Sequence, residues 1–236
     1  MNFRALTAML MFLASGVIFS SCNKMNDNDD NNAAVAGVMG FNMAPDQDAI
    51  VMTLDGNAIS NSPLGYNNYT GMYVAVYAGN RTFRTYNVNG SIPLTETGVS
   101  LDTNKYYSVY FLGTSGNYKH VVAEDKFDEM SGSNGKAYIR YIQAVTDSTP
   151  SRVLITGGGN TFVDEEASYS QTSQFVAVDP GELNIDLNNG GDVDVSRTIT
   201  VEAKKVYTIL FMGISNSSNP DLAEQIKFVT NGSLAD

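Results

Sequence analysis

The sequence is poor in the residues on which several protein classes depend. It contains one cysteine, one histidine and no tryptophan, and its 14 lysines and arginines stand against 25 aspartates and glutamates. A single cysteine cannot form a disulfide within the chain, so packed cores have to stabilise the fold. One histidine and one cysteine are too few for a zinc-type site, and we expect no metal or cofactor. The excess of negative charge repels phosphates and excludes nucleic acid as an expected partner.

Long apolar runs are also scarce, and the longest lies at the beginning of the chain. Arg4 precedes the apolar stretch 5–19, which is shorter than the roughly 20 residues that a membrane helix needs. This pattern predicts a secretory signal peptide over residues 1–21. The segment Phe19-Ser20-Ser21-Cys22 resembles the lipobox of bacterial lipoproteins, although Phe19 replaces the usual leucine-like residue. We therefore predict that Cys22 is acylated and binds membrane lipid; the alternative is an ordinary buried thiol.

Residues 22–34 form the expected link between this anchor and the folded part. The stretch after Cys22 is rich in Asn and Asp and too poor in apolar residues to order itself by burial, which predicts a flexible acidic tether. The same run resembles signals that direct some lipoproteins to the outer face of the outer membrane, and a plain spacer is the alternative. A calcium loop counted from Asp27 fails, because Asn32 and Val38 replace the required Gly and Glu. The expected location is the cell envelope, as an outer-membrane lipoprotein, with the inner and the outer face both open.

The rest of the sequence repeats itself at an offset of 100 to 102 residues, as the spacings of Gly113 to Gly213 and of Gly79 to Gly181 show. Four stations recur in the same order: residues 74–79 and 176–181, residues 106–113 and 206–213, Ala123-Glu124 and Ala223-Glu224, and Asp46 and Asp147. A unit of this length suits a whole β domain better than a solenoid repeat. We predict two domains, residues 35–130 and 136–236, joined by the Gly/Ser/Asn-rich segment 131–135.

Each unit consists of short runs that are typical of β-strands. These runs are rich in Tyr, Val, Ile, Phe and Thr and are separated by Gly, Asn, Asp and Pro. Residues 72–77 are apolar on both faces, which predicts a central strand, whereas residues 82–86 alternate and predict a half-exposed one. Tyr107, Val109 and Phe111 should line one side of a later strand. Turns are expected at Asp55-Gly56, Asn89-Gly90, Asn189-Gly190-Gly191 and Asn231-Gly232. The predicted fold is two tandem antiparallel β-sandwich domains of immunoglobulin-like or transthyretin-like topology.

Several of these elements also form an ordered set of motifs. In the first unit they are Asn42-Met43-Ala44-Pro45-Asp46, Leu54-Asp55-Gly56, Leu64-Gly65-Tyr66, Ala78-Gly79 and the strand from Tyr107 to Gly113. In the second unit the turn at Asp147 lacks the proline and Tyr169-Ser170 replaces the Tyr-Gly-like element, while Pro180-Gly181 and residues 207–213 match well. The set resembles the domain of unknown function family 4397, found as tandem repeats in bacterial exported and surface lipoproteins. The resemblance implies an Ig-like repeat at the cell envelope and brings no catalytic residues.

No catalytic arrangement is evident in the sequence. His120 has no serine, cysteine or metal-ligand partner at a recognisable spacing, so we expect a structural role for it. Calcium sites at Asp46 with Asp48, or at Asp192 with Asp194, compete with the favoured interpretation that these side chains cap their own turns. We therefore predict that the protein is not an enzyme.

Binding and structural roles remain as hypotheses. The first is a surface binding or adhesion module whose loops contact a protein or a polysaccharide. The candidate contact residues are Asp46, Asp48, Tyr66, Tyr69 and Asp147. Tyrosine combines an apolar ring with a hydroxyl and suits sugars, but the lack of tryptophan weakens this version, and Tyr73 and Tyr77 are expected in the core. The second hypothesis is a structural or fimbria-like envelope subunit that presents other proteins, and the third is a glycan-processing accessory protein.

Overall fold

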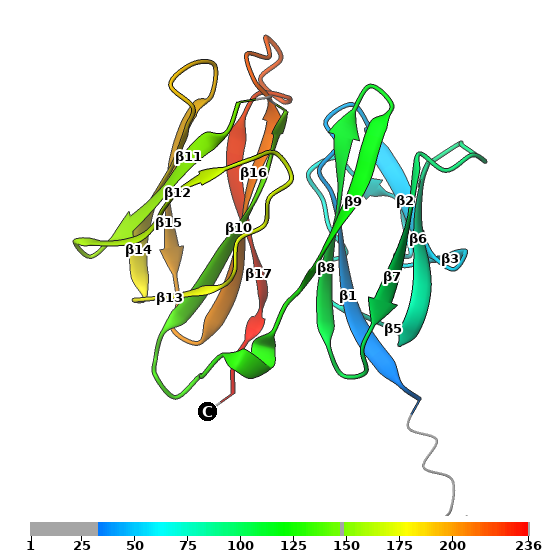
Figure 1. The fold of residues 1–236 in the computed structure, drawn as a ribbon, viewed down its shortest axis with the longest axis horizontal. Coiled ribbons are helices and arrows are strands. Elements are labelled where there is room, and N and C mark those ends of the chain that lie inside the picture. Colours follow the sequence, from blue (N-terminus) through cyan, green and yellow to red (C-terminus); the bar gives the residue numbers. More distant parts are fainter. Residues whose placement is uncertain (1–32, 147–148, 236) are drawn as a thin grey trace, which may run out of the picture. The chain divides into compact units, whose positions relative to one another are not determined.

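The computed structural model describes residues 33–146 and 149–235, and almost all regular elements in these ranges are strands (Figure 1). The one helical element described there is a short 3-10 helix, η1 (Phe127–Glu129). Within the described ranges, no helix has the length and apolar character needed to cross a bilayer. Residues 33–236 form one compact unit. Cys22 lies outside the described residues.

The first sandwich is built from nine strands. They are β1 (Val35–Asn42), β2 (Ala49–Leu54), β3 (Asn57–Ala58), β4 (Leu64–Gly65), β5 (Val74–Tyr77), β6 (Gly79–Asn87), β7 (Thr95–Leu101), β8 (Tyr106–Thr114) and β9 (Asn117–Glu124). One sheet has the order β5-β1-β8-β9, and the other has the order β3-β2-β6-β7 with β4 added to β2. The Asp55-Gly56 turn between β2 and β3 has positive φ at both residues, as a tight hairpin requires.

The second sandwich follows the same plan with eight strands. They are β10 (Ala137–Thr146), β11 (Ser151–Gly157), β12 (Asn160–Ala167), β13 (Val176–Val178), β14 (Gly181–Asn188), β15 (Asp194–Val201), β16 (Lys205–Ile214) and β17 (Gln225–Ser233). Its sheets have the orders β13-β10-β16-β17 and β12-β11-β14-β15. The prediction of two tandem β-sandwiches is therefore confirmed, and the two copies share one strand order.

One pairing in each sandwich departs from the expected antiparallel arrangement. Strand β1 pairs in parallel with β8, and β10 pairs in parallel with β16, whereas the other strand pairs are antiparallel. The partners of each parallel pair are separated by the whole of the other sheet along the chain. A sequence pattern shows which residues form strands but not which distant strands pair, so this feature was not predicted.

Each sandwich has its own apolar core between its two sheets. In the first sandwich the core contains the predicted row Tyr107, Val109 and Phe111 of β8, together with Ile50, Met52 and Phe83. In the second sandwich the corresponding row is Tyr207, Ile209 and Phe211 of β16. The alternation predicted for residues 82–86 is confirmed, because Phe83 and Thr85 are buried and their neighbours are partly exposed.

Three expectations from the sequence are wrong. Residues 74–77 form an edge strand, β5, and not a central one, and Tyr77 is 67% exposed. Asn231 and Gly232 do not form a turn but lie at a register shift within β17. Ala123-Glu124 ends β9, whereas Ala223-Glu224 precedes β17, so this sequence match does not mark equivalent positions. Apolar content and Asn-Gly pairs are shared by edges, bulges and turns, which is why the pattern alone misassigned them.

Candidate functional site at the junction of the two sandwiches

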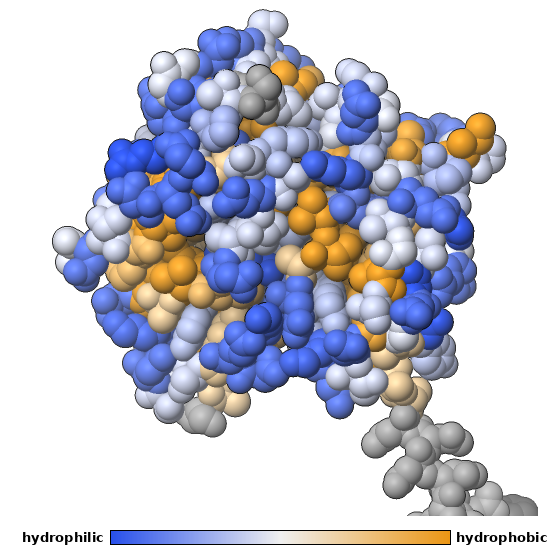
Figure 2. Space-filling model, in the orientation of Figure 1, coloured by the Kyte–Doolittle hydropathy of each residue, from blue (hydrophilic) through white to orange (hydrophobic). Residues whose placement is uncertain are grey.

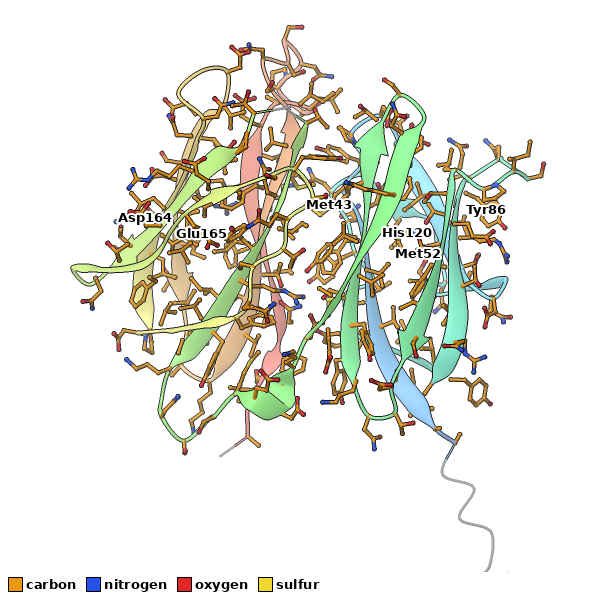
Figure 3. The ribbon with its side chains drawn as sticks, viewed as in Figure 1. Met43, Met52, Tyr86, His120, Asp164 and Glu165 are labelled. Carbon is orange, nitrogen blue, oxygen red and sulfur yellow. The ribbon has the colours of Figure 1, made fainter. Side chains whose placement is uncertain are left out.

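A third apolar cluster joins the two sandwiches, and we call it the central cluster. It lies between the sheet β5-β1-β8-β9 and the sheet β13-β10-β16-β17. Its buried members are Met39, Phe41, Met43, Tyr110, Leu112, Ile142, Ala144, Leu210, Met212 and Val229. Met43 points into this region from the first sandwich (Figure 3). Strands β8 and β16 are consequently buried on both faces, which makes the two sandwiches one packed body.

A buried ion pair crosses the junction beside the central cluster. Asp125, just after β9, pairs with Arg140 of β10, and both side chains are almost completely shielded from solvent. The Asp125 carboxylate also accepts hydrogen bonds from the hydroxyls of Tyr73 (2.5 Å) and Ser108 (2.8 Å). Arg140 donates to the hydroxyl of Tyr110 at 2.9 Å.

The same burial controls the ionisation of this group of residues. Burial raises the pKa of Asp125, and the positive charge of Arg140 opposes that rise. Burial and the neighbouring carboxylate also raise the pKa of Tyr73, so its hydroxyl remains a hydrogen-bond donor. A buried charge that loses its partner is strongly destabilising. The ion pair therefore links the end of β9 in the first sandwich to β10 in the second.

A cleft of about 520 Å³ opens beside this ion pair, and we call it the junction cleft. Its lining residues come from both sandwiches and from η1: Tyr73, Tyr106, Phe127, Asp128, Met130, Asn231, Gly232, Ser233, Leu234 and Ala235. Three of them are aromatic rings in mutual edge-to-face contact, with centroids 5.0 Å (Tyr73 and Tyr106), 5.8 Å (Tyr73 and Phe127) and 5.4 Å (Tyr106 and Phe127) apart. Tyr106 is 43% exposed, so part of its ring is available to a ligand.

Polar groups accompany the rings of the junction cleft. Asn231 is buried, and its amide donates to the Tyr73 hydroxyl at 3.3 Å, while its oxygen accepts from Thr208 at 2.7 Å. Asp128 is exposed and its carboxylate lies 2.6 Å from Lys105 Nζ. An apolar aromatic wall with a few placed polar groups is the usual composition of a small-ligand site.

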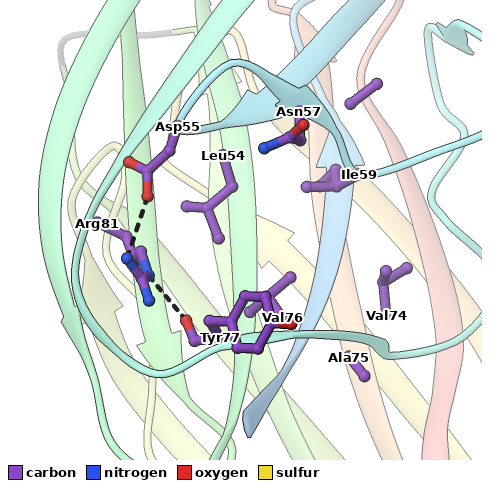
Figure 4. Close-up of a pocket in the computed structure, with 10 residues that line it drawn as sticks. Leu54, Asp55, Asn57, Ile59, Val74, Ala75, Val76, Tyr77 and Arg81 are labelled. Carbon is purple, nitrogen blue, oxygen red and sulfur yellow. Dashed lines mark hydrogen bonds and ion pairs between the residues drawn. The ribbon is translucent and has the colours of Figure 1, made fainter. Parts of the chain in front are cut away.

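A second hollow lies on the first sandwich, between the edge strands β3 and β5, and we call it the edge groove (Figure 4). It has a volume of about 400 Å³, and Leu54, Ile59 and Val76 are among its lining residues. At one end Arg81 lies 3.5 Å from the Asp55 carboxylate and donates to the Tyr77 carbonyl at 2.9 Å. In the view of Figure 2, hydrophilic side chains surround apolar patches on both sandwiches. The exposed Ile92 lies in the loop between β6 and β7.

The predicted aspartate contacts lie away from both hollows. The Asp46 carboxylate accepts from the Ser115 backbone N–H at 2.7 Å and from the Tyr118 hydroxyl at 2.8 Å, so it braces the β8–β9 turn. Asp48 contributes its carbonyl to the Tyr66 backbone N–H at 2.9 Å. Among the described residues, no three His, Cys, Asp or Glu side chains gather as metal ligands would. Asp147 lies outside the described residues.

The predicted tyrosine contacts pack at the junction. Tyr66 and Tyr69 lie against the central cluster, and the Tyr69 ring stacks on Phe41 with centroids 5.4 Å apart. Burial raises the pKa of Tyr66 to about 12. These rings hold the sandwiches together, and their role as ligand contacts stays a prediction. Tyr73, which the sequence predicts in the core, is half-buried and lines the junction cleft.

His120 has the structural role expected of it. It is buried between the two sheets of the first sandwich (Figure 3), with Nε2 2.8 Å from the Thr85 hydroxyl and Nδ1 3.1 Å from the Thr97 hydroxyl. Burial lowers its pKa to about 4, so the imidazole is neutral at physiological pH.

The residues that define the junction were not identified from the sequence. Arg140 carried a usable signal, because it is a single cation within the apolar strand Ala137–Thr146. A charge in such a strand needs a buried partner. Asp125 and Phe127 lie in a mixed segment, and Tyr106 begins the repeated strand 106–113, so none of the three carries a comparable signal.

Comparison with known families identifies the type of repeat. The model of the family described as a domain of unknown function, DUF4397, matches residues 36–150 and 137–225. The chain belongs to the DUF4397 family. The two matches overlap in β10, and together they run from β1 to the first residue of β17.

Solved structures similar to this DUF4397 chain share little sequence with it. A family 26 carbohydrate-binding module of Amy13K from Eubacterium rectale, in complex with maltoheptaose, is 8% identical over 84% of this chain and 97% of that chain, with a TM-score of 0.26. The tip fimbrial protein Mfa3 from Porphyromonas gingivalis is 8% identical over 84% and 99%, with a TM-score of 0.30. An α-glucan-binding streptococcal virulence factor is 11% identical over 83% and 97%, with a TM-score of 0.24. A search of curated protein sequences gives no match.

Proposed function

We propose that this DUF4397 chain is a lipid-anchored binding module of the cell envelope, and that the junction cleft is its ligand site. The observation that carries the proposal is the aromatic wall of the cleft, formed by Tyr73, Tyr106 and Phe127 at the meeting point of two sandwiches. The volume of about 520 Å³ lies within the usual range of small-ligand pockets. Because a buried ion pair fixes the sandwiches beside it, the cleft is preformed, which lowers the entropic cost of binding.

A polysaccharide is the favoured ligand, and a protein segment is the alternative. A sugar ring has apolar C–H faces that pack on aromatic rings and hydroxyl edges that need hydrogen-bonding partners. The cleft offers the partly exposed ring of Tyr106 together with the Asp128 carboxylate. The same aromatic side chains also suit a peptide, since tyrosine is enriched at protein interfaces.

The test is binding of the wild-type protein to a glycan array, followed by titration calorimetry with the glycan that gives the strongest signal. Tyr106→Ala should raise the Kd at least about tenfold, because it removes the exposed part of the aromatic wall. Tyr86→Ala is the matched control, since Tyr86 lies on β6, on the outer sheet of the first sandwich (Figure 3). Absence of any glycan signal above background contradicts the polysaccharide version, and equal Kd values for both variants contradict the cleft as the site.

The lipid anchor is tested separately. Cys22→Ser removes the sulfur that would carry the acyl chain, so the variant should leave the membrane fraction and appear in the soluble one. Retention of Cys22→Ser in the membrane contradicts the proposed anchor without affecting the cleft. Protease treatment of intact cells then distinguishes the two faces of the outer membrane, because only a surface-exposed protein is degraded.

A structural subunit is the second candidate, and the edge groove favours it. Strand β5 ends its sheet, and an added strand from another chain would pair with its free edge while apolar side chains enter the groove beside it. Ala75→Pro on β5 should then abolish assembly, since proline cannot donate to a strand ladder. A wild-type protein that is monomeric and free of partners when isolated in mild detergent contradicts this role.

A further inference from the structure

The contacts across the junction are arranged in equivalent pairs. Asn67 of the first sandwich reaches Gln225 of the second, with Nδ2 3.5 Å from Oε1. Lys119 of the first sandwich reaches Ser170 of the second, with Nζ 2.6 Å from Oγ. If Asn67 is structurally equivalent to Ser170, and Gln225 to Lys119, then both contacts join the same two positions of the repeat, with the sandwiches exchanged.

Backbone geometry establishes that Asn67 and Ser170 are equivalent. The backbone N–H of Asn67 donates to the carbonyl of Asn42 in β1, and that of Ser170 donates to the carbonyl of Gln143 in β10. Both residues have positive φ, 73° and 71°. Each also follows a tyrosine that packs on the central cluster. The two residues therefore hold the same place in the two sandwiches.

Strand register establishes the other half of the equivalence. Lys119 lies opposite Leu112 in the β8–β9 pair, and Gln225 lies opposite Met212 in the β16–β17 pair. Leu112 and Met212 each immediately precede the repeated glycine. Thus the position held by Asn67 in the first sandwich contacts the position held by Gln225 in the second. The same two positions, held by Ser170 in the second sandwich and Lys119 in the first, contact each other in return. This reciprocity is the mark of a twofold interface.

The buried ion pair breaks this symmetry. Met39 lies opposite Ser108 in β1–β8, and Arg140 lies opposite Thr208 in β10–β16, so Met39 is the counterpart of Arg140. Ser108 donates to the Asp125 carboxylate at 2.8 Å, and Thr208 donates to the Asn231 amide oxygen at 2.7 Å.

Asp125 and Asn231 are therefore also counterparts. The first sandwich supplies the aspartate and the second supplies the arginine, while the mirrored positions carry the uncharged pair Met39 and Asn231. A pairing of two first sandwiches would oppose Asp125 to methionine, and a pairing of two second sandwiches would oppose Arg140 to asparagine.

We propose that the junction is an internal version of a twofold dimer interface, and that Asp125 and Arg140 direct each sandwich to the other kind instead of to its own. The junction surface of the first sandwich is thus complementary to that of the second sandwich, and not to a copy of itself. An uncompensated buried charge disfavours like-with-like contacts between chains. This inference does not depend on whether the cleft binds a ligand.

The first test exchanges each charged residue for its counterpart in the intact chain. Arg140→Met and Asp125→Asn should each lower the folded-to-unfolded ratio in urea by more than about 100-fold, because each leaves one buried charge unpaired. The double variant copies the uncharged pair of the other side and should return to within about tenfold of the wild type. Additive losses in the double variant would overturn the proposal. The exposed pair Arg84 and Glu96 provides the control cycle, in which no such recovery is expected.

The second test moves the ion pair to its mirrored position. In the Asp125→Asn/Arg140→Met chain, Met39→Arg alone or Asn231→Asp alone should destabilise again, and the two together should recover at least about tenfold in the folded-to-unfolded ratio. Recovery requires that position 39 faces position 231 as position 140 faces position 125. If the combined variant is no more stable than either of the two, the twofold relation is wrong.

Discussion

The two sandwiches differ most at one free edge. Strand β3 of the first sandwich has two residues, whereas its counterpart β12 in the second has eight. The edge groove opens beside the short strand, and Asn57 and Ala58 of β3 form part of its lining. The eight-residue β12 covers the neighbouring strand β11 along its length, whereas the two-residue β3 pairs with only the last two residues of β2. The comparison teaches that one strand order has been kept while the exposed edges have been free to diverge.

Positions that are the same in both sandwiches serve backbone geometry. Gly113 and Gly213 both have positive φ, 128° and 117°. The hydroxyls of Tyr107 and Tyr207 both accept a hydrogen bond from a backbone N–H five residues upstream, at 3.0 and 3.1 Å. Such a tyrosine corner fixes the connection that enters the strand. The repeated sequence motif is therefore a record of required backbone conformations.

The largest expected effect comes from the shared glycines. A Cβ at Gly113 would lie 2.1 Å from the Asn117 carbonyl oxygen, and one at Gly213 would lie 2.3 Å from the Ala223 carbonyl oxygen. Gly113→Ala and Gly213→Ala should each lower the free energy of unfolding by at least about 3 kcal/mol, measured by urea denaturation. Gly98→Ala in the exposed strand β7 is the control, since nothing lies within 4 Å of the added Cβ. A large loss of stability for one of the two variants alone would contradict the structural equivalence of Gly113 and Gly213.

The next effect separates the sandwiches by their response to pH. His120 lies opposite Phe111, and its counterpart opposite Phe211 is Ile226, which does not titrate. Because the folded pKa of about 4 is below the ordinary value of 6.5, the unfolded chain binds more protons between these pH values. Stability from this group is fully present above pH 6.5 and declines as the pH falls towards 4, by about 3 kcal/mol in total.

Unfolding of the wild type and of His120→Gln between pH 4 and 8 measures this contribution. The wild type should lose more stability on acidification than the variant does, since the carboxylates titrate in both. Parallel pH profiles for the two proteins would show that the pKa of His120 is the same in the folded and the unfolded state, which contradicts the prediction.

The tyrosine corners should give a smaller and equal effect. Tyr107→Phe and Tyr207→Phe each remove one hydrogen bond to a backbone N–H while keeping the ring in its core. We expect a loss of about 1 to 2 kcal/mol for each variant in urea denaturation. If the losses in unfolding free energy of the two variants differ by more than about 1 kcal/mol, the two tyrosines do not have a common role.

Surface ion pairs should give the smallest effect. Arg84 pairs with Glu96 on the first sandwich and Arg152 pairs with Asp164 on the second, and all four side chains are substantially exposed. Arg84→Ala and Arg152→Ala should leave the thermal midpoint nearly unchanged, because solvent screens such pairs. A large shift would place these strands among the parts that stabilise the fold.

The sequence contains enough information for the strands and the repeat, but not for the way the repeats pack. Alternation in residues 82–86 and the row Tyr107, Val109 and Phe111 follow from the period of a strand. The double burial of β8 depends on a second sandwich that sequence patterns do not place. For the same reason the sequence predicts Tyr77 in the core, although β5 is an edge strand.

The candidate site was even less accessible to sequence reasoning. Tyr73, Phe127 and Asn231 are far apart in the chain, and only the packing of β17 and η1 beside the first sandwich brings them into one cleft. The single arginine in β10 was the one clue, and it pointed to a buried partner without revealing which of the acidic residues it was.

The central cluster has a consequence for local motion. With two inner sheets enclosed between two outer ones, backbone amides of β1, β8, β10 and β16 have protein on both faces, whereas those of β3 and β5 border solvent. Amide hydrogen exchange should therefore be slowest in β1, β8, β10 and β16 and fastest in the edge strands β3 and β5. Local opening should therefore be most frequent at the edge groove, even though Tyr73, the residue before β5, is hydrogen-bonded to the buried Asp125.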